Sequence, residues 1–478
     1  MQEIRQLEDP ARLLEPDPAQ REHLVSRVIA YANNFLDELT SAPAYAAHPD
    51  NGRGIYDSPI SEEGIGIDEV LALLDENVDS PGINTTSGRY LGYIPGGGLF
   101  HAALGDYLAA VTNQYAGLFF ASPGAVRIEN MLLRWMADMV GYPDSAAGNL
   151  ASGGSIANLT AIVTARDACG VVPKTISNSV VYVTEHVHHC IGKALHVAGL
   201  GNCVRREVRV DEGYRMDPVA LNSAIQADRQ AGLQPWLIVA SAGTTNTGSV
   251  DPLAEIAEIA AAQGLWFHVD GAYGALFALC PEGQAILGGM DKSDSIVLDP
   301  HKTLFLPYGS GAVLVKERAK LYAAFSAHAD YLQDVLDAVE ELSSADLSPE
   351  LTRHFRGLRL WLPLKVLGVA PFRAALSEKI HLARYFYEQI QKIDGFEVGP
   401  YPDLSVVTYR YLPKRGDPDE FNQRLMGAVQ DGGRIFVSST RVDGAFVLRA
   451  AIVCFRTHLD DVDEALEVLS RTAQELEN

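Results

Sequence analysis

The feature that most constrains this chain is a series of short apolar runs in its middle third, separated by segments with helical spacing. Residues 251–263 have such spacing, with Asp251 placed to cap a helix and Pro252 at its first position. Gly264 is expected to end that helix. Apolar strands that alternate with helices predict an α/β fold, with a mostly parallel sheet covered on both faces. The predicted strands are PWLIVASAG (235–243), LWFHVD (265–270), SDSIVLD (293–299) and GAVLVK (311–316).

The N-terminal region differs from this middle part. Residues 20–40 and 66–77 space their apolar groups at helical intervals, and the segment between them is rich in Pro, Gly, Asn and Asp. Residues 1–85 are therefore predicted to form a helical arm without a core of its own.

The C-terminal region also has its own pattern. From about residue 376 a long helix leads to two predicted antiparallel strands within 396–412, then a helix near 418–430, the strand FVLRAAIV and a final helix. This mixture predicts a small α+β domain over 376–478, which leaves 86–375 as the large domain.

Charge and composition exclude several classes of partner. The chain of 478 residues has 38 Lys and Arg against 61 Asp and Glu, a net charge of −23, and no basic run. This argues against a nucleic acid or an anionic membrane as partner. The N-terminus lacks the apolar segment of a signal peptide, no stretch suits a transmembrane helix, and the five cysteines lack a disulfide or zinc pattern. We expect a soluble, cytoplasmic protein.

A glycine-rich turn is the first feature that indicates a ligand-binding site. In NLASGGSIANLTAIVTARDA (149–168), Gly153 and Gly154 precede a predicted helix. Glycine lets a ligand approach the backbone closely, and the free N–H groups of a helix start bind anions. An ordinary capped helix produces the same pattern, so this turn alone does not define a phosphate site.

Two strand ends add to this signal. Asp270 follows the apolar run LWFHV, where a buried carboxylate needs a cation or several donors. Lys302 follows the next predicted strand, with His301 before it and Leu304 after it. The chain has only ten lysines, and an apolar setting favours the neutral amine that a Schiff base requires. The alternative interpretations are that Asp270 only caps the following turn and that Lys302 is an ordinary surface lysine.

Taken in order, these motifs resemble the group II amino-acid decarboxylases, which are fold-type I pyridoxal-phosphate enzymes with the architecture of aspartate aminotransferase. Each motif is weak alone, but their order and spacing are specific. The similarity extends from about residue 50 to the C-terminus. The matching segments are YLGYIPGG (90–97), FFASPGAVRIE (119–129), SGGSIAN (152–158), TEHVHHCIGKA (184–194), AGTTNTGSVDP (242–252), HVDGAYG (268–274), DPHK (299–302) and FRGLRLW (355–361).

The resemblance implies roles for individual residues. Lys302 is expected to bind pyridoxal 5'-phosphate as an internal aldimine, and Asp270 to pair with the pyridine nitrogen. His188 matches the position that stacks on the ring and is the third expected catalytic residue. The expected cofactor-binding residues are Gly154, Ser155, His188, Thr245, Asn246, Asp270, Ala272, His301 and Lys302, and the expected substrate pocket is Tyr93, Ile94 and Pro95.

The resemblance also implies the reaction: decarboxylation of an L-amino acid to its amine and CO₂ through an external aldimine and a quinonoid. The Tyr-x-Pro segment at 93–95 resembles aromatic-type relatives rather than glutamate-type ones, so an aromatic substrate is expected. An acidic amino acid, a carbon–carbon lyase reaction on a phosphorylated substrate and a non-catalytic cofactor-binding protein remain alternatives.

The product depends on a loop in which family members commonly carry a tyrosine. The matching stretch, 334–354, has no tyrosine, and the nearest is Tyr331, which we expect in the core or outside the loop. A decarboxylating aldehyde synthase therefore remains an alternative, and His188 or water could protonate the product. Two other departures are Asp299, where aromatic decarboxylases have Asn near the phosphate, and Thr303, where many relatives have an aromatic residue.

Fold-type I enzymes place their cofactor at a dimer interface, so the resemblance implies a homodimer in which residues 1–85 wrap the partner. No metal is expected, because His186, His188 and His189 do not have a zinc spacing.

Overall fold

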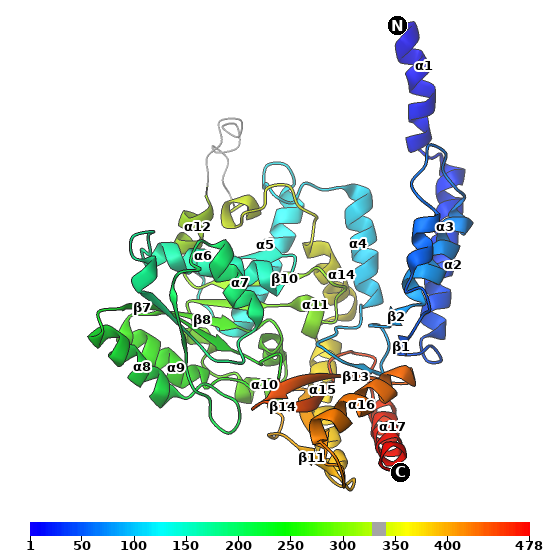
Figure 1. The fold of residues 1–478 in the computed structure, drawn as a ribbon. Helices are drawn as coiled ribbons and strands as arrows, with labels where there is room; N and C mark the ends of the chain where they lie inside the picture. Colours follow the sequence, from blue (N-terminus) through cyan, green and yellow to red (C-terminus); the bar gives the residue numbers. More distant parts are fainter. Residues whose placement is uncertain (327–340) are drawn as a thin grey trace.

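The computed structural model describes residues 1–326 and 341–478. A large α/β body carries a C-terminal unit on one side and an N-terminal arm that projects from it (Figure 1). Among the described residues, no single helix has both the length and the apolar composition to cross a membrane; α14 (Gly357–Leu367) and α15 (Ala370–Ile390) meet those two criteria only as a bent pair.

The large body is built on a seven-stranded sheet, and the predicted mostly parallel α/β architecture is confirmed. Only β10 is antiparallel, and it pairs with both β4 and β9. The four predicted strands correspond to β7, β8, β9 and β10. In sheet order the strands are β4 (Ala147–Ala151), β10 (Gly311–Val315), β9 (Ser295–Leu298), β8 (Trp266–Asp270), β7 (Gln234–Ser241), β5 (Ser179–Val183) and β6 (Val204–Glu207).

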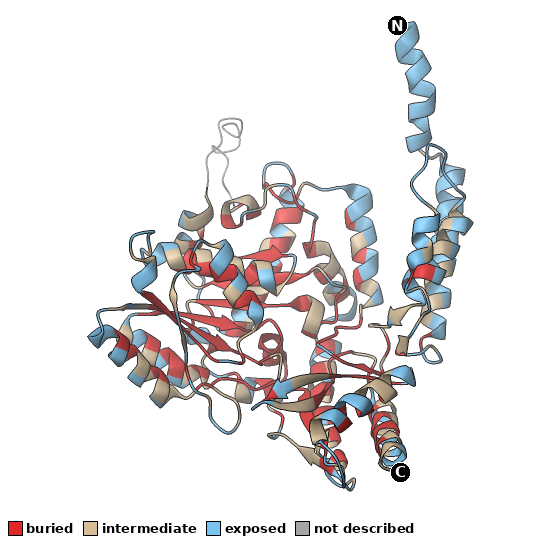
Figure 2. Ribbon diagram, in the orientation of Figure 1, coloured by how far each residue is buried: buried red, intermediate tan, exposed pale blue. Residues whose placement is uncertain are grey.

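Both faces of this sheet are covered, as continuous apolar strands require. Alternate residues of β9 enter two different cores: Ile296 and Leu298 pack on one face, and Val297 on the other. One core includes α5 (Pro123–Val140), α8 (Pro218–Gln230) and α9 (Leu253–Gln263), and the other α6 (Gly154–Ala168) and α7 (His189–Val197). The buried residues form a continuous layer through the sheet (Figure 2).

The prediction that Asp251 caps α9 is wrong. Gly264 ends the helix in the left-handed conformation, as predicted, but Pro252 is the N-cap and Asp251 does not cap it. The Asp251 carboxylate is buried and accepts hydrogen bonds from the N–H groups of Met216 and Ser241, each at 2.7 Å. Burial raises the pKa of Asp251 to about 6. The side chain therefore joins the segment around Met216 to the end of β7 instead of starting a helix.

The C-terminal unit is a five-stranded sheet with helices, consistent with the predicted α+β pattern. The long helix begins at Ala370, earlier than predicted, and the two antiparallel strands occur as β11 and β12. Sequence reasoning missed β13, and also β3, which joins this sheet parallel to β13. The elements are β11 (Phe396–Val398), β12 (Val406–Tyr411), β14 (Ala445–Ala451), β13 (Phe436–Val442) and β3 (Tyr90–Leu91), with α16 (Pro418–Asp431) and α17 (Leu459–Glu477).

The N-terminal arm contains α1 (Gln2–Ala11), α2 (Pro18–Glu38) and α3 (Ile67–Leu74), so both predicted helices are present. The α2 helix starts with a capping box in which Asp17 and Gln20 bond each other's backbone N–H groups. None of the three helices contains a buried residue, and the arm projects away from the body (Figures 1 and 2).

Candidate active site

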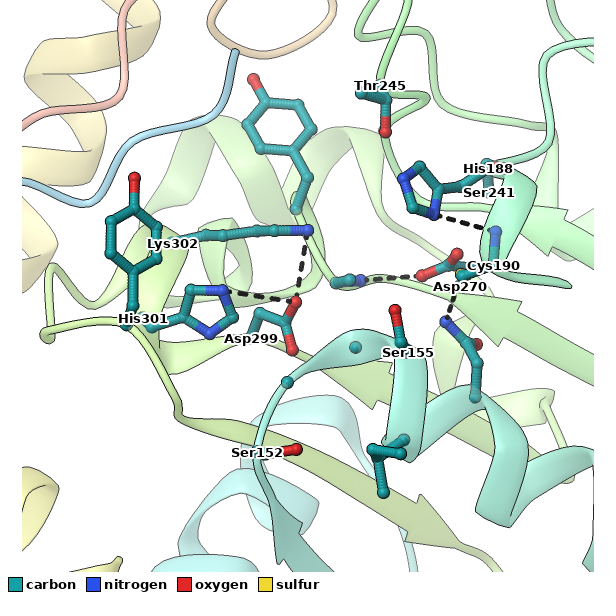
Figure 3. A pocket seen from close by; sticks show the side chains of 18 of the residues that line it. Ser152, Ser155, His188, Cys190, Ser241, Thr245, Asp270, Asp299, His301 and Lys302 are labelled. Atoms are coloured by element: carbon teal, nitrogen blue, oxygen red, sulfur yellow. Dashed lines mark hydrogen bonds and ion pairs between the residues drawn. The ribbon is translucent and has the colours of Figure 1, made fainter. Parts of the chain in front are cut away.

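A cavity of about 420 Å³ lies at the carboxyl ends of three central strands. Ser241 ends β7, Asp270 ends β8 and Asp299 follows β9, and all three residues line the cavity (Figure 3). This is the edge of an open α/β sheet at which ligands usually bind. Eight of the residues predicted from the sequence also line it: Gly154, Ser155, His188, Thr245, Asp270, Ala272, His301 and Lys302.

Asp270 is a buried carboxylate that forms no ion pair with any residue the structure describes. It is 8% exposed, and its Oδ1 accepts a hydrogen bond from the Ala272 N–H at 3.2 Å. Among the described residues, the nearby Lys302 pairs with a different carboxylate, that of Asp299. A protonated ring nitrogen in the cavity would supply the positive charge that Asp270 lacks.

Lys302 extends into the cavity from α11 (Pro300–Thr303), the short helix that follows β9. Its Nζ lies 3.2 Å from Asp299 Oδ2, and its side chain is 23% exposed (Figure 3). Among the described lining residues it is the only lysine or arginine. The cavity therefore holds one primary amine, which faces the same space as Asp270.

His188 is held in a defined orientation at the start of α7. Its Nδ1 accepts a hydrogen bond from the Cys190 N–H at 3.3 Å, which assigns the proton of the neutral ring to Nε2. Burial lowers the pKa of His188, and the nearby charge of Asp270 opposes this shift. The imidazole is therefore a mainly neutral, flat surface beside Asp270 and Lys302 (Figure 3).

The glycine turn before α6 forms a close-fitting end of the cavity. A methyl group added at Gly154 would lie 2.8 Å from Asp299 Oδ2 and 3.2 Å from the Ala272 Cβ, and Gly153 has φ +156°. The Ser155 hydroxyl points into the cavity from the first turn of α6 (Figure 3). First-turn amides and a hydroxyl suit a phosphate group, which this cavity has room to hold.

His301 faces the same end of the cavity. Its Nδ1 donates to the carbonyl oxygen of Ser310 at 2.5 Å, because a carbonyl can only accept. Its Nε2 lies 3.9 Å from Asp299 Oδ2. This end of the cavity thus contains the Asp299 carboxylate beside His301.

Four predicted residues lie outside the cavity lining. Asn246 is half-buried, and its carbonyl accepts a hydrogen bond from Arg449. Tyr93 is 58% exposed, whereas Ile94 and Pro95 are buried. The following residue, Gly96, packs against the carbonyl oxygens of His301 and Lys302, so this segment lies behind the lysine. Tyr331 and residues 334–340 of the expected loop lie outside the described residues.

Sequence reasoning missed two buried groups next to the site. Arg449 on β14 is 3% exposed, and its Nε and Nη2 donate to the carbonyl oxygens of Asn246 and Thr245. Burial lowers its pKa to about 10. An arginine within the apolar run FVLRAAIV was the available signal, because buried arginines require partners.

The second missed group is His268, on the same face of β8 as Asp270. Its Nε2 bonds Asn158 Oδ1 at 2.7 Å and its Nδ1 bonds Ser295 Oγ at 2.8 Å. Asn158 in turn donates to Cys190 Sγ at 3.4 Å. Burial lowers the pKa of His268 to about 4. This network links β8, β9, α6 and α7, and two of its members, Asn158 and Cys190, line the cavity.

The fold and this cavity together define a pyridoxal-phosphate enzyme of fold type I. The family model described as "Pyridoxal-dependent decarboxylase conserved domain" matches residues 52–412. The chain belongs to this decarboxylase family and is a pyridoxal-phosphate-dependent carboxy-lyase of amino acids.

Three similar proteins illustrate the range of this family. An aromatic-L-amino-acid decarboxylase of Bacillus atrophaeus is 34% identical over 87% of this chain and 88% of its own length. A phenylacetaldehyde synthase of Arabidopsis thaliana is 28% identical over 83% and 84%. A crystal structure of Oryza sativa TDC with PLP and tryptamine has a TM-score of 0.91 and 27% identity, and the match covers 97% of this chain and 99% of that one.

Proposed function

We propose that this protein decarboxylates an aromatic L-amino acid to its amine and CO₂. The observation that carries the substrate class is that no arginine, and no lysine other than Lys302, is among the described residues that line the cavity. An acidic substrate would bring a second carboxylate that needs a cation. The Tyr273 and Tyr308 rings instead provide aromatic surface there. The names of the relatives support the same substrate class.

The chain's own residues would have separate roles at this site. Bound pyridoxal phosphate supplies a conjugated ring that accepts the electron pair left behind when the substrate loses CO₂. Asp270 would hold a proton at the ring nitrogen, which strengthens that electron acceptor. The Lys302 amine would bind the cofactor, and by taking the place of the product amine at the end of the reaction it would release the product. Gly154, Ser155 and His301 would hold the phosphate.

His188 would support the ring and exclude water from one side of it. Its neutral imidazole avoids placing a second positive charge beside the Lys302 ammonium. Its Nε2–H also offers a proton within the cavity, so it is a candidate donor to the product carbon.

A screen of the twenty amino acids, with products identified by mass spectrometry, tests the substrate. We expect turnover of tyrosine, dihydroxyphenylalanine (added to the screen) or tryptophan to exceed that of all non-aromatic amino acids. A preference for glutamate or aspartate would contradict the proposal. The same screen with phosphorylated amino alcohols tests the lyase alternative.

Aldehyde formation is a second candidate, because the described part of the expected loop, 341–354, has no tyrosine and because a phenylacetaldehyde synthase is among the relatives. Hydrogen peroxide and ammonia, measured alongside CO₂, separate the two reactions, since simple decarboxylation forms neither. A Tyr331→Phe variant, measured in parallel, reports whether the tyrosine nearest that loop affects the product.

We also propose that the working form is a cytoplasmic homodimer. The exposed apolar side chains of the arm support the dimer, and the five cysteines, all free, are typical of a reducing compartment. Sedimentation across a dilution series tests the dimer.

A further inference from the structure

Asp299 occupies a helix-capping position but does not act as a cap. It is the N-cap residue of α11, where an aspartate side chain usually accepts a hydrogen bond from a first-turn N–H. No such bond is present. The carboxylate turns toward the cavity, and its Oδ2 lies 3.2 Å from Lys302 Nζ (Figure 3). The side chain thus gives up a local backbone bond and contacts the reactive amine.

The Asp299 carboxylate is buried and only partly hydrogen-bonded, so water does not stabilise its negative charge. The residue is 1% exposed, and its Oδ1 is buried and has no hydrogen-bond partner within residues 1–326 and 341–478. Three glycines enclose it: methyl groups at Gly154 and Gly311 would lie 2.8 and 2.6 Å from its oxygens, and Gly153 lies next to Gly311. A buried carboxylate with an orphan oxygen is stabilised mainly by nearby positive charge.

We propose that Asp299 is the counter-ion that holds the Lys302 ammonium in place whenever this amine is not bound to the cofactor. During turnover the substrate's amine replaces Lys302, and the freed side chain would otherwise be able to leave the cavity. The ion pair keeps Nζ in the cavity, close to the position to which it must later return. This role rests on the proposed function of Lys302.

Other ionisable groups around Lys302 do not replace Asp299. Asp270 on β8, His188 before α7 and Tyr308 in the following loop share the cavity with Lys302. Among the described residues, only Asp299 forms an ion pair with Nζ. His301 also faces Asp299, with Nε2 3.9 Å from Oδ2, so its protonated form would share the same carboxylate.

The amine's chemical reactivity tests this proposal without any turnover. The full-length chain is freed of pyridoxal phosphate with hydroxylamine and treated at fixed pH with trace acetic anhydride. Acetylation of Lys302 is measured by mass spectrometry relative to Lys174, which is exposed. Only a neutral amine reacts, and a nearby carboxylate favours the ammonium form. In Asp299→Asn we expect the relative rate to rise about threefold to tenfold, the range for one partly solvated charge pair.

Asp291→Asn is the matched control, because Asp291 is exposed and precedes the opposite end of β9. Its relative rate should stay within twofold of the wild type. A rate within twofold in Asp299→Asn, with an unchanged circular-dichroism spectrum, would overturn the proposal. If asparagine disturbs the fold, Asp299→Ser carries the same test with the same two outcomes. A failed decarboxylase assay leaves this result unaffected, since acetylation needs neither substrate nor cofactor.

Discussion

The central sheet and the N-terminal arm lie at opposite extremes of burial. Every residue of β5, β8, β9 and β10 is buried, whereas no residue of α1, α2 or α3 is. Both regions have apolar patterns in the sequence, but the sheet buries its apolar side chains within one chain. The arm leaves apolar side chains in contact with solvent, and such surfaces usually mark an interface. The contrast is what the proposed function and the proposed homodimer require: a buried sheet that carries the cavity, and an arm whose apolar side chains a second copy would cover.

The largest effect is expected at Lys302, which follows a strand of the central sheet. Lys302→Ala should lower decarboxylation at least roughly 10³-fold, because the amine that binds the cofactor is removed. It should also remove the absorbance near ~420 nm that pyridoxal phosphate gains on binding a lysine. Absorption spectra before and after borohydride reduction provide the measurement. A variant that keeps this band would show that another lysine binds the cofactor.

Asp270→Asn tests the carboxylate at the next strand end. It should lower kcat by roughly 10²–10³-fold, because a neutral amide cannot stabilise a positive ring nitrogen as a carboxylate does. Steady-state kinetics and bound-cofactor content should be measured together. Loss of activity explained entirely by loss of bound cofactor would contradict an electronic role for Asp270.

The arm side of the contrast is tested on α2, where Val28 and Ile29 are 44% and 43% exposed. The double variant Val28→Asp, Ile29→Asp should weaken dimerisation by at least roughly 100-fold, because buried interface positions do not accept unpaired charge. Analytical ultracentrifugation measures this change. Val219→Asp, on α8 and 71% exposed, is the matched control and should have no effect. Equal dimer affinity in both variants would remove the arm from the interface.

His268 gives the smallest expected effect. Its pKa of about 4 in the folded protein is below the ~6.5 of an unfolded histidine. Its contribution to stability is thus fully present above pH 6.5 and is lost as the pH falls toward 4. Relative to His268→Gln, the wild type should lose about 2 kcal/mol of unfolding free energy between pH 7 and pH 5. Urea titrations at both pH values check this. Parallel pH profiles would show that His268 does not titrate in this way.

The sequence predicted those parts of the molecule in which one local rule decides the outcome. The strands before Asp270 and Lys302 are mainly apolar, so their burial and the position of both side chains followed from the pattern. Asp251 was misplaced because α9 begins one residue later than predicted, with Pro252 as its N-cap, and the carboxylate instead accepts the backbone N–H groups of Met216 and Ser241. Local propensity cannot anticipate a tertiary partner.

The same limit explains the missed groups. Arg449 and Asn246 are 203 residues apart in the sequence, and His268 and Asn158 are 110 apart. Strand β13 was missed because its central Ser-Ser-Thr-Arg segment breaks the apolar pattern. Tertiary pairing with β14 and β3 makes this segment a strand.

The pairing of β3 with β13 has a consequence for synthesis. Tyr93, just after β3, donates its N–H to the Ser438 hydroxyl of β13, which lies 345 residues further along the chain. At roughly 5–20 residues per second, the ribosome needs about 20–70 s to deliver that partner. During this interval the segment behind the lysine has no strand to join, although most of the large sheet has already emerged. The nascent chain therefore lacks the partner strand of β3 until its last tenth is made.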